Sequence, residues 1–367
     1  MNKGVEGIFA PYSADFIILT SMTQFYYPDG GVNTIGNWNY ETGYKIKAEN
    51  DFEVTMKGTK ISDPSVDLAV GWNLIPVLSS CEVPVVDVFE GFSGLTIVKQ
   101  VAGPYIYWPA YNINTLVSLV PGKAYFVATG SAGIVTYPGC TKSSSSKWQD
   151  NKPENFTPWN NPHYTASSHA IAFPAEVLKS SQIQPGDIIG VFTPEGLCAG
   201  FTEVTGLISN TALVSFSNDE TTPEMDGFEI GEMFHFKLFR LQSNQEFEME
   251  VAFDPSLPNM GLFENQGLSA VKSVTLNAAG LTETNGITCD VYPNPSHGNF
   301  ALTMSSWPAN LQICLMDASG QTIKTYKPGT KLSGSAYTFN LAELPKAIYF
   351  LKLVDNGFLE IKKVVID

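Results

Sequence analysis

The sequence predicts a nearly all-β protein made of several domains. The chain has 367 residues, more than a single hydrophobic core usually serves, and 44 % of them are apolar. The apolar positions are rich in aromatic and β-branched residues, with 23 Phe and 15 Tyr, which favour strands. The 31 Gly and 23 Pro break these runs at short intervals, as turns between strands do.

The charge balance argues against nucleic acid as a partner. With 36 acidic and 21 basic side chains, the formal charge is −15, which repels phosphate backbones and anionic lipid surfaces. No run reaches the roughly 18 apolar residues that a membrane span needs. The residues after Met1 lack the basic and apolar segments of a signal peptide, so an export signal is expected outside this sequence.

Residues 1–140 contain an internal repeat, and its first unit is truncated. Three pieces return at one offset of 81 residues, from 28 to 109, 33 to 114 and 44 to 125. They are Tyr26-Tyr27-Pro28 with Tyr107-Trp108-Pro109, Val32-Asn33-Thr34-Ile35 with Ile113-Asn114-Thr115-Leu116, and Tyr44-Lys45-Ile46 with Tyr125-Phe126-Val127. The second unit opens with Gly71-Trp72-Asn73-Leu74-Ile75, for which the first has no counterpart.

The aromatic residues of the repeat allow two interpretations. Flat rings match the apolar face of a sugar, so Tyr27, Trp38 and Trp108 are candidate ligand-stacking residues for glycans or a cell-surface polymer. Aromatic residues at strand period more often fill small cores, and this interpretation is favoured. The two Asn-Thr pairs are expected to bond the backbone of local turns.

Residues 16–137 resemble the Gly-Trp-Asn-Leu-Ile repeat units of large secreted Bacteroidetes proteins. That resemblance implies an extracellular repeat and assigns no activity to it. The five cysteines have no metal-ligand spacing, and a Cys81–Cys140 disulfide and free thiols are equally open. The other three are Cys198, Cys289 and Cys314.

Residues 141–162 form a low-complexity linker, and residues 163–276 form a predicted β-sandwich-like module. Its strand-like runs are residues 169–173, 187–192, 212–216 and 233–238. The acidic loop 218–232 contains weak candidate calcium ligands, Asp219 and Asp226, but no EF-hand spacing. A solvated turn is the favoured interpretation, and no cofactor is expected.

The sequence contains no recognised catalytic arrangement. The four histidines form no HExxH motif, and GxSxG and P-loop motifs are absent. Cys198 lies between apolar residues of a predicted strand, where nothing lowers the pKa of its thiol. We therefore expect no enzyme, although acidic residues from distant segments can meet in a hydrolase cleft.

After a linker at residues 277–287, residues 288–367 predict a small C-terminal antiparallel β-sandwich. Alternating strands are separated by turns at Asp317-Ala318-Ser319-Gly320 and Asp355-Asn356-Gly357, and Asn-Gly is a strong hairpin signal. About eighty residues in this arrangement are enough to fold as a small sandwich.

This segment resembles the type A sorting domain of the type IX secretion system. The matching residues are Tyr292, Pro293, Asn294, Pro295, Gly298, Phe300, Asp317, Gly320, Leu341, Leu344, Pro345, Tyr349, Lys362 and Lys363. Ala347 departs from the glycine that is usual before the Ile-Tyr step. The resemblance implies a Bacteroidetes protein that the translocon and sorting machinery deliver to the outer cell surface or release.

Two roles are equally open for Lys362 and Lys363. A terminal strand can present charge and backbone groups for recognition, and lysines also protect an edge strand from aggregation. For the rest of the chain we expect an adhesive or glycan-binding function. A secreted hydrolase, a hydrolase accessory module and a structural spacer are the alternatives.

Overall fold

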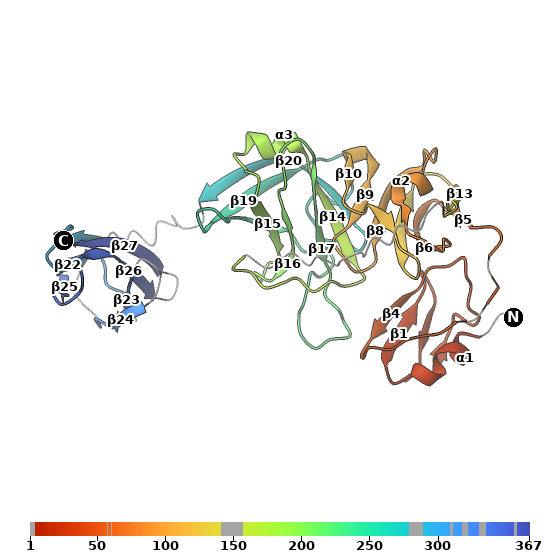
Figure 1. The fold of residues 1–367 in the computed structure, drawn as a ribbon, viewed down its shortest axis with the longest axis horizontal. Coiled ribbons are helices and arrows are strands. Elements are labelled where there is room, and N and C mark those ends of the chain that lie inside the picture. Colours follow the sequence, from red (N-terminus) through yellow and green to blue (C-terminus); the bar gives the residue numbers. More distant parts are fainter. Residues whose placement is uncertain are drawn as a thin grey trace. The chain divides into compact units, whose positions relative to one another are not determined.

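The computed structural model describes residues 4–56, 58–59, 61–140, 157–278, 289–308, 311–317, 322–329, 335–355 and 358–367. It confirms the nearly all-β fold class (Figure 1). The chain forms two compact units, Met1–Asn277 and Ala278–Asp367. The helices are short: α1 (Val5–Phe9), η1 (Ala10–Tyr12), α2 (Val85–Val88), η2 (Pro109–Tyr111) and α3 (Ala175–Ser180). Within the described ranges, no helix is long and apolar enough to cross a membrane.

The N-terminal module is a four-stranded antiparallel sheet in the order β3-β2-β1-β4. Its strands are β1 (Phe16–Thr20), β2 (Phe25–Tyr27), β3 (Val32–Asn33) and β4 (Lys45–Ala48). One face packs with α1 into a small core around Phe9, Phe16 and Leu19. The opposite face of β2 is exposed.

The second module is a larger version of the same arrangement. Its main sheet has the order β10-β9-β8-β12-β6, and two strand pairs, β11 with β7 and β13 with β5, accompany it. The strands are β5 (Ser65–Leu68), β6 (Gly71–Pro76), β7 (Val83–Pro84), β8 (Leu95–Gln100), β9 (Ile106–Trp108), β10 (Ile113–Asn114), β11 (Ser118–Leu119), β12 (Ala124–Thr129) and β13 (Gly133–Thr136). A disulfide joins Cys81 to Cys140, which decides between the two alternatives left open by the sequence.

The strand pairings of the two modules correspond residue by residue. Tyr27 pairs with Val32 in the first module, and 81 residues later Trp108 pairs with Ile113. The Thr34 hydroxyl accepts a hydrogen bond from the Phe25 N–H and donates to the Phe25 carbonyl. The Thr115 hydroxyl makes the same two bonds to Ile106. For the threonines, the expected side-chain bonds to local backbone are confirmed.

The two modules differ at one edge of the sheet. In the second module β12 lies between β8 and β6, so both of its edges are paired. In the first module β4 pairs only with β1 and forms the edge of its sheet. Among the described residues, no strand pairs with β4 at the position that β6 occupies beside β12.

The third module is one seven-stranded sheet that wraps around its own core. The order is β16-β15-β18-β19-β20-β14-β17, and β14 and β20 are parallel. Its strands are β14 (Ser168–Phe173), β15 (Asp187–Phe192), β16 (Cys198–Glu203), β17 (Thr211–Phe216), β18 (His235–Arg240), β19 (Gln245–Phe253) and β20 (Leu268–Ala278). Three of the four predicted strand-like runs, 169–173, 187–192 and 212–216, lie within strands, and the fourth, 233–238, overlaps β18, which begins at His235.

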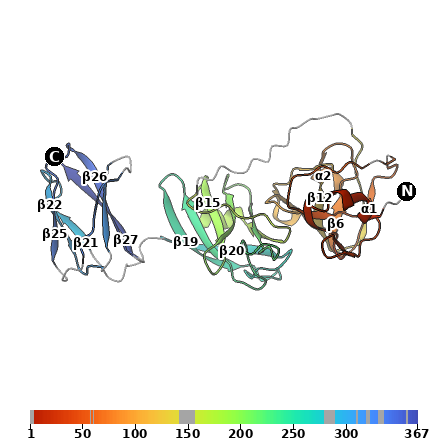
Figure 2. The same cartoon turned by 90° about the horizontal axis from the view of Figure 1, so that it is seen from below.

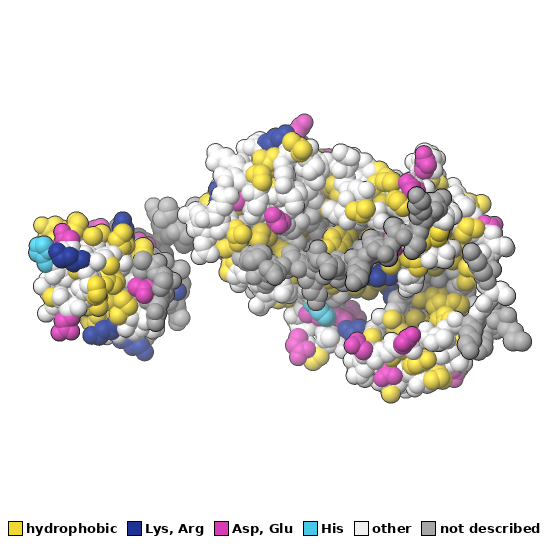
Figure 3. Space-filling model, viewed as in Figure 1, with side chains coloured by type: hydrophobic (Ala, Val, Ile, Leu, Met, Phe, Trp, Pro, Cys, Tyr) yellow, Lys and Arg dark blue, Asp and Glu magenta, His cyan; other side chains and the backbone are white. Residues whose placement is uncertain are grey.

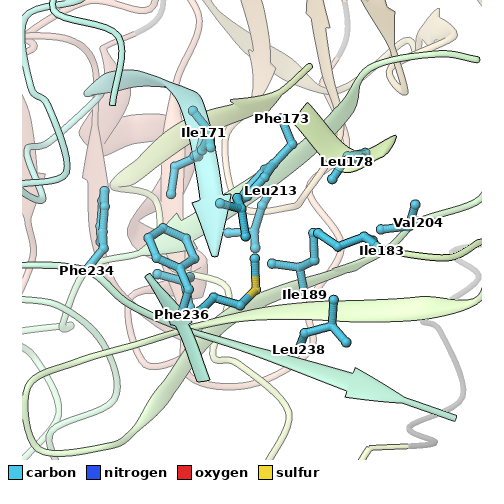
Figure 4. Close-up of a cluster of buried hydrophobic side chains, with 14 of the residues drawn as sticks. Ile171, Phe173, Leu178, Ile183, Ile189, Val204, Leu213, Phe234, Phe236 and Leu238 are labelled. Carbon is cyan, nitrogen blue, oxygen red and sulfur yellow. The ribbon is translucent and has the colours of Figure 1, made fainter. Parts of the chain in front are cut away.

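The first and last strands of this sheet approach each other closely. A side chain at Gly200 on β16 would have its Cβ 2.3 Å from the Val214 carbonyl oxygen on β17, so only glycine fits there. The module that the sequence predicted as β-sandwich-like is therefore a sheet that nearly closes into a barrel. Its interior is apolar, and Figure 4 shows Ile171, Leu213 and Phe236 among the buried side chains that surround the centre.

The second and third modules share a hydrophobic core. Ile106, Trp108 and Ile113 of the second module pack in one buried cluster with small side chains of the barrel, including Ala170 and Ala212. Trp108 is only 1 % exposed. Each Å² of apolar surface removed from water contributes about 25 cal/mol to the stability of the fold, so this contact stabilises the pair of modules strongly. This shared core explains why the second and third modules belong to one compact unit.

A buried lysine crosses the same interface. Lys99 on β8 is 1 % exposed, and its Nζ donates a hydrogen bond of 2.7 Å to the Ser168 carbonyl oxygen on β14. The ammonium also lies 5.4 Å from the centroid of the Trp72 ring. Because burial disfavours the charged form, the pKa of Lys99 falls to about 7. Burial and the charge of Lys99 hold the pKa of His169 well below its usual value.

The C-terminal unit is a sandwich of two antiparallel sheets, as predicted. One has the order β21-β22-β25 and the other β24-β23-β26-β27. The strands are β21 (Cys289–Tyr292), β22 (Asn299–Met304), β23 (Gln312–Met316), β24 (Thr322–Tyr326), β25 (Ala336–Asn340), β26 (Ala347–Asp355) and β27 (Phe358–Ile366). Figure 2 shows β22 and β25 facing β26 and β27, with the core of this unit between the sheets.

Replacement of Lys99 by Met should remove a pH dependence of stability. The pKa of Lys99 is about 7 in the folded protein and 10.5 in the unfolded chain, so the unfolded chain holds more protons between these values. Stability therefore rises with pH across this window, by up to about 1.4 kcal/mol per pH unit. We expect the free energy of unfolding of K99M, from urea titrations, to lack this rise.

The matched control is Lys179→Met, since Lys179 is exposed on α3. This variant should keep the pH dependence of the wild-type protein. An equal slope in wild type and K99M would show that Lys99 remains charged in the folded state.

Candidate functional site

The turn after β21 holds the last strand of the protein in place. Both X-Pro bonds of Tyr292-Pro293-Asn294-Pro295 are cis. The Asn294 amide donates a hydrogen bond of 2.7 Å to the Lys363 carbonyl oxygen and accepts one of 2.8 Å from the Val365 N–H. A single side chain thus bonds β27 as a neighbouring strand would. Asn is suited to this because its amide both donates and accepts.

Ser296 and the motif residue Gly298 complete this connection. The Ser296 N–H bonds the Val365 carbonyl, and the Asp367 N–H bonds the Ser296 carbonyl. Gly298 has φ +86°, and a Cβ there would lie 2.6 Å from the Ala342 backbone nitrogen. Only glycine fits this position without backbone movement. The motif residues, separated by about seventy positions in sequence, therefore meet in one place.

The remaining described motif residues serve the sandwich itself. The Tyr349 hydroxyl donates a hydrogen bond of 2.8 Å to the Pro345 carbonyl, and its ring is buried. Phe300 stacks on Phe339 across β22 and β25, with ring centroids 5.0 Å apart. Asp317 lies directly after β23 and is half-buried. Gly320 lies outside the described residues.

The two lysines of the terminal strand lie at the edge of the four-stranded sheet. Lys362 Nζ is 3.0 Å from the Glu360 carboxylate. Partial burial acts to lower the pKa of Lys362, but the hydrogen bond to Glu360 and nearby negative charges leave it raised. Lys363 is exposed. The backbone of β27 from Lys363 onward is already bonded by Asn294 and Ser296, so this part of the edge is not free for strand pairing.

A groove of about 430 Å³ lies beside the same turn. Tyr292 borders it and is 80 % exposed, which is unusual for a large aromatic side chain. The groove is lined by Tyr292, Pro293, Asn299, Phe300, Ala301, Thr338, Phe339 and Asn340. The sequence motif named Tyr292, but nothing in the sequence indicated that a groove adjoins it.

The three candidate stacking residues have three different environments. Trp108 is buried in the core shared with the barrel, so its ring is not available to a ligand, and we correct that candidate assignment. Trp38 is half-buried and stacks on Tyr44, with ring centroids 4.2 Å apart. Tyr27 is 37 % exposed. Of the three, only Tyr27 presents a substantial surface to solvent.

Tyr27 belongs to an exposed apolar strip that sequence reasoning missed. Phe25 and Tyr27 alternate with buried Tyr26 on β2, and Val32 pairs with Tyr27 from β3. Phe25 and Val32 are 38 % and 39 % exposed. The Gly30 backbone packs against the Tyr27 ring, since a Cβ there would lie 2.4 Å from Cδ1. We call Phe25, Tyr27 and Val32 the aromatic strip.

The candidate calcium ligands are bonded to other groups of the protein. Asp219 forms an ion pair with Lys47 of β4. Asp226 accepts a hydrogen bond from the Asp219 N–H and lies 2.5 Å from His163 Nδ1. Burial raises the pKa of Asp219, but its bonds to Lys47 and Thr221 outweigh burial and lower it. Within the described ranges, no three His, Cys, Asp or Glu side chains form a metal-binding group.

Acidic side chains lie at several places on the visible face, and some of them lie beside basic side chains and a histidine (Figure 3). Cys198 is buried on β16, and burial raises the pKa of its thiol to about 11. The thiol is therefore protonated near neutral pH, and the nucleophilic thiolate is rare.

Residues 290–367 match the family described as the secretion system C-terminal sorting domain. The match covers the whole of the C-terminal sandwich from Asp290 onward. A comparison with curated proteins gives no significant match.

Among solved structures, the chain is similar to one titled "Biofilm associated protein - BSP domain". The two share 8 % identity over 49 % of this chain and 24 % of that chain, with a TM-score of 0.17. This chain thus spans about a quarter of the length of that protein.

Replacement of Asn294 by Asp should destabilise the C-terminal unit more than replacement by Ala. A carboxylate cannot donate to the Lys363 carbonyl and would place negative charge against it, whereas Ala only removes two bonds. We expect losses of about 1–3 kcal/mol for N294D. Amide hydrogen exchange of β27 measures this, and Lys352→Gln on β26 is the control.

Proposed function

We propose that this protein, which the type IX secretion system exports through its C-terminal sorting domain, is a non-catalytic adhesin of a Bacteroidetes-type cell surface. The match at residues 290–367 makes it a secreted or cell-surface protein. The exposed aromatic strip of the N-terminal module is the observation that carries the adhesive part of the proposal.

The disulfide agrees with a location outside the cytosol. The Cys81–Cys140 disulfide closes the second module, and such bonds persist outside the reducing cytosol. The resemblance of residues 16–137 to secreted repeat units supports the same placement.

The aromatic strip is the proposed contact surface. Its counterparts in the second module, Ile106, Trp108 and Ile113, are covered by the chain's own barrel. Phe25, Tyr27 and Val32 occupy the equivalent positions and remain more than a third exposed. A flat apolar face held rigidly by strands suits the apolar face of a glycan or another surface polymer. The ring of Tyr27 adds a hydroxyl for a directional bond.

For export, we propose that the translocon reads the region where the Tyr292 turn meets β27. This region combines the exposed Tyr292 ring, its groove and the positive charge of Lys362 and Lys363. Aromatic anchors beside charged groups are typical of protein recognition sites.

Deletion of residues 288–367 should abolish surface display and leave the cargo in the periplasm. Within the full chain, the double variant Lys362→Gln/Lys363→Gln should reduce display several-fold because it removes two charges from the proposed recognition region. Protease accessibility on whole cells measures display.

The double variant Lys324→Gln/Lys327→Gln provides the control, since both lysines are exposed on or beside β24 at the opposite edge of the same sheet. Equal display of the two double variants would assign Lys362 and Lys363 to edge protection only. Normal display of the deletion variant would overturn the sorting assignment itself.

The variant Phe25→Ser/Tyr27→Ser should weaken adhesion at least about tenfold, because stacking residues each contribute about 1 kcal/mol or more. Binding of the intact chain to a glycan array and to isolated surface polymer measures it. Ile208→Ser is the control, since Ile208 is 95 % exposed in the barrel module. Absence of binding at millimolar ligand would contradict the adhesive function and favour a spacer.

A further inference from the structure

The groove beside Tyr292 is a hollow in the outer face of the three-stranded sheet, the face that turns away from β26 and β27 (Figure 2). Phe300 and Phe339 pair across β22 and β25 and belong to the core. Because side chains alternate along a strand, Ala301 and Thr338 lie on the opposite, outer face. Tyr292 of β21 pairs with Ala301 and therefore lies on this outer face as well.

The small side chain of Ala301 produces the hollow. It lies between Tyr292 on one side and Thr338 on the other, in one row across the sheet. The next row adds Asn299 and Asn340, which are paired with each other at one end of the groove. The volume of about 430 Å³ lies within the range of about 300–1,000 Å³ that is usual for small-molecule sites.

The groove combines an aromatic ring with uncharged hydrogen-bonding groups. Tyr292 is 80 % exposed, so most of its ring is open to solvent. Asn299, Thr338 and Asn340 are also exposed, and their amides and hydroxyl can both donate and accept hydrogen bonds. Every residue that lines the groove in the described part of the chain is uncharged.

These properties favour a neutral ligand that carries hydroxyl groups. A phosphate, sulfate or carboxylate needs a cationic partner, which the lining residues do not supply, and the chain has a formal charge of −15. A purely apolar ligand would cover the two asparagine amides without replacing their bonds to water. A pyranose ring has an apolar face for an aromatic side chain and hydroxyl groups at its edge for the amides.

We propose that this groove of the sorting domain binds a neutral oligosaccharide. One sugar ring stacks on Tyr292 above Ala301, and its hydroxyl groups bond Thr338 and the asparagine pair. The site is separate from the aromatic strip, because the strip belongs to Met1–Asn277 and the groove to Ala278–Asp367. The proposal goes beyond export, since the purified protein binds this ligand without the translocon.

The test applies the purified full chain to an array of neutral oligosaccharides of glucose, galactose, mannose and N-acetylhexosamines. The parent protein is the variant Phe25→Ser/Tyr27→Ser, which removes the contribution of the aromatic strip. We expect saturable binding of at least one oligosaccharide, measured by calorimetry. Ala301→Phe fills the hollow and Tyr292→Ser removes the ring, so each should weaken binding at least about tenfold.

Ala336→Phe is the matched control for Ala301→Phe. Ala336 is exposed and pairs with Thr303 in another row of the same sheet face, outside the lining of the groove. This variant should bind the oligosaccharide as its parent does. Amide hydrogen exchange of β22 and β25 checks that all of these variants keep the folded sandwich.

Absence of binding by every neutral oligosaccharide at millimolar concentration would overturn the proposal. Equal binding by Ala301→Phe and its parent would overturn it by placing the sugar outside the groove. If the wild-type chain binds and the parent variant does not, the aromatic strip is the glycan site, which supports the adhesive function and contradicts a site in the groove. Binding of a proline-rich peptide in the groove without any sugar binding would assign the groove to a polypeptide instead.

Discussion

The packing of Ile106, Trp108 and Ile113 against the small side chains of the barrel is the contact on which the cargo region depends. It removes from water the face that each module would otherwise expose, and it joins segments on both sides of a low-complexity linker into one unit. Small residues such as Ala170 and Ala212 let the two sheets approach closely. The same interface buries Lys99, whose ammonium bonds the Ser168 carbonyl and lies near the Trp72 ring.

The two repeated modules show how the same local sequence has different consequences. Phe25 and Tyr27 occupy the positions of Ile106 and Trp108. In both modules a threonine hydroxyl accepts a hydrogen bond from the backbone N–H of the first of these residues. In the second module these positions pack against small side chains of the barrel, whereas Phe25 and Tyr27 remain more than a third exposed. Burial at these positions is therefore set by what packs on the strand, and the strand sequence alone does not decide it.

This explains which parts of the structure could be predicted from the sequence. Strand period, glycine turns and the 81-residue offset are local signals, and the strands they predict are present. The burial of Trp108 depends on residues more than sixty positions later, for which no local signal exists. The groove beside Tyr292 likewise forms from two strands that are distant in sequence. The export motif was recognisable by family resemblance, whereas the bonds from Asn294 to the last strand depend on the folded arrangement of residues about seventy positions apart.

The hydrogen bonds from Asn294 to β27 make the surface of the sorting domain depend on its folding. An unfolded chain contains the same motif residues. The joined turn and terminal strand form only when folding brings Asn294 within hydrogen-bond distance of Lys363 and Val365, about seventy residues later. A receptor that binds this geometry would distinguish a folded C-terminal unit from an unfolded one. Because all of these bonds lie within Ala278–Asp367, such recognition would be independent of the sequence of the cargo.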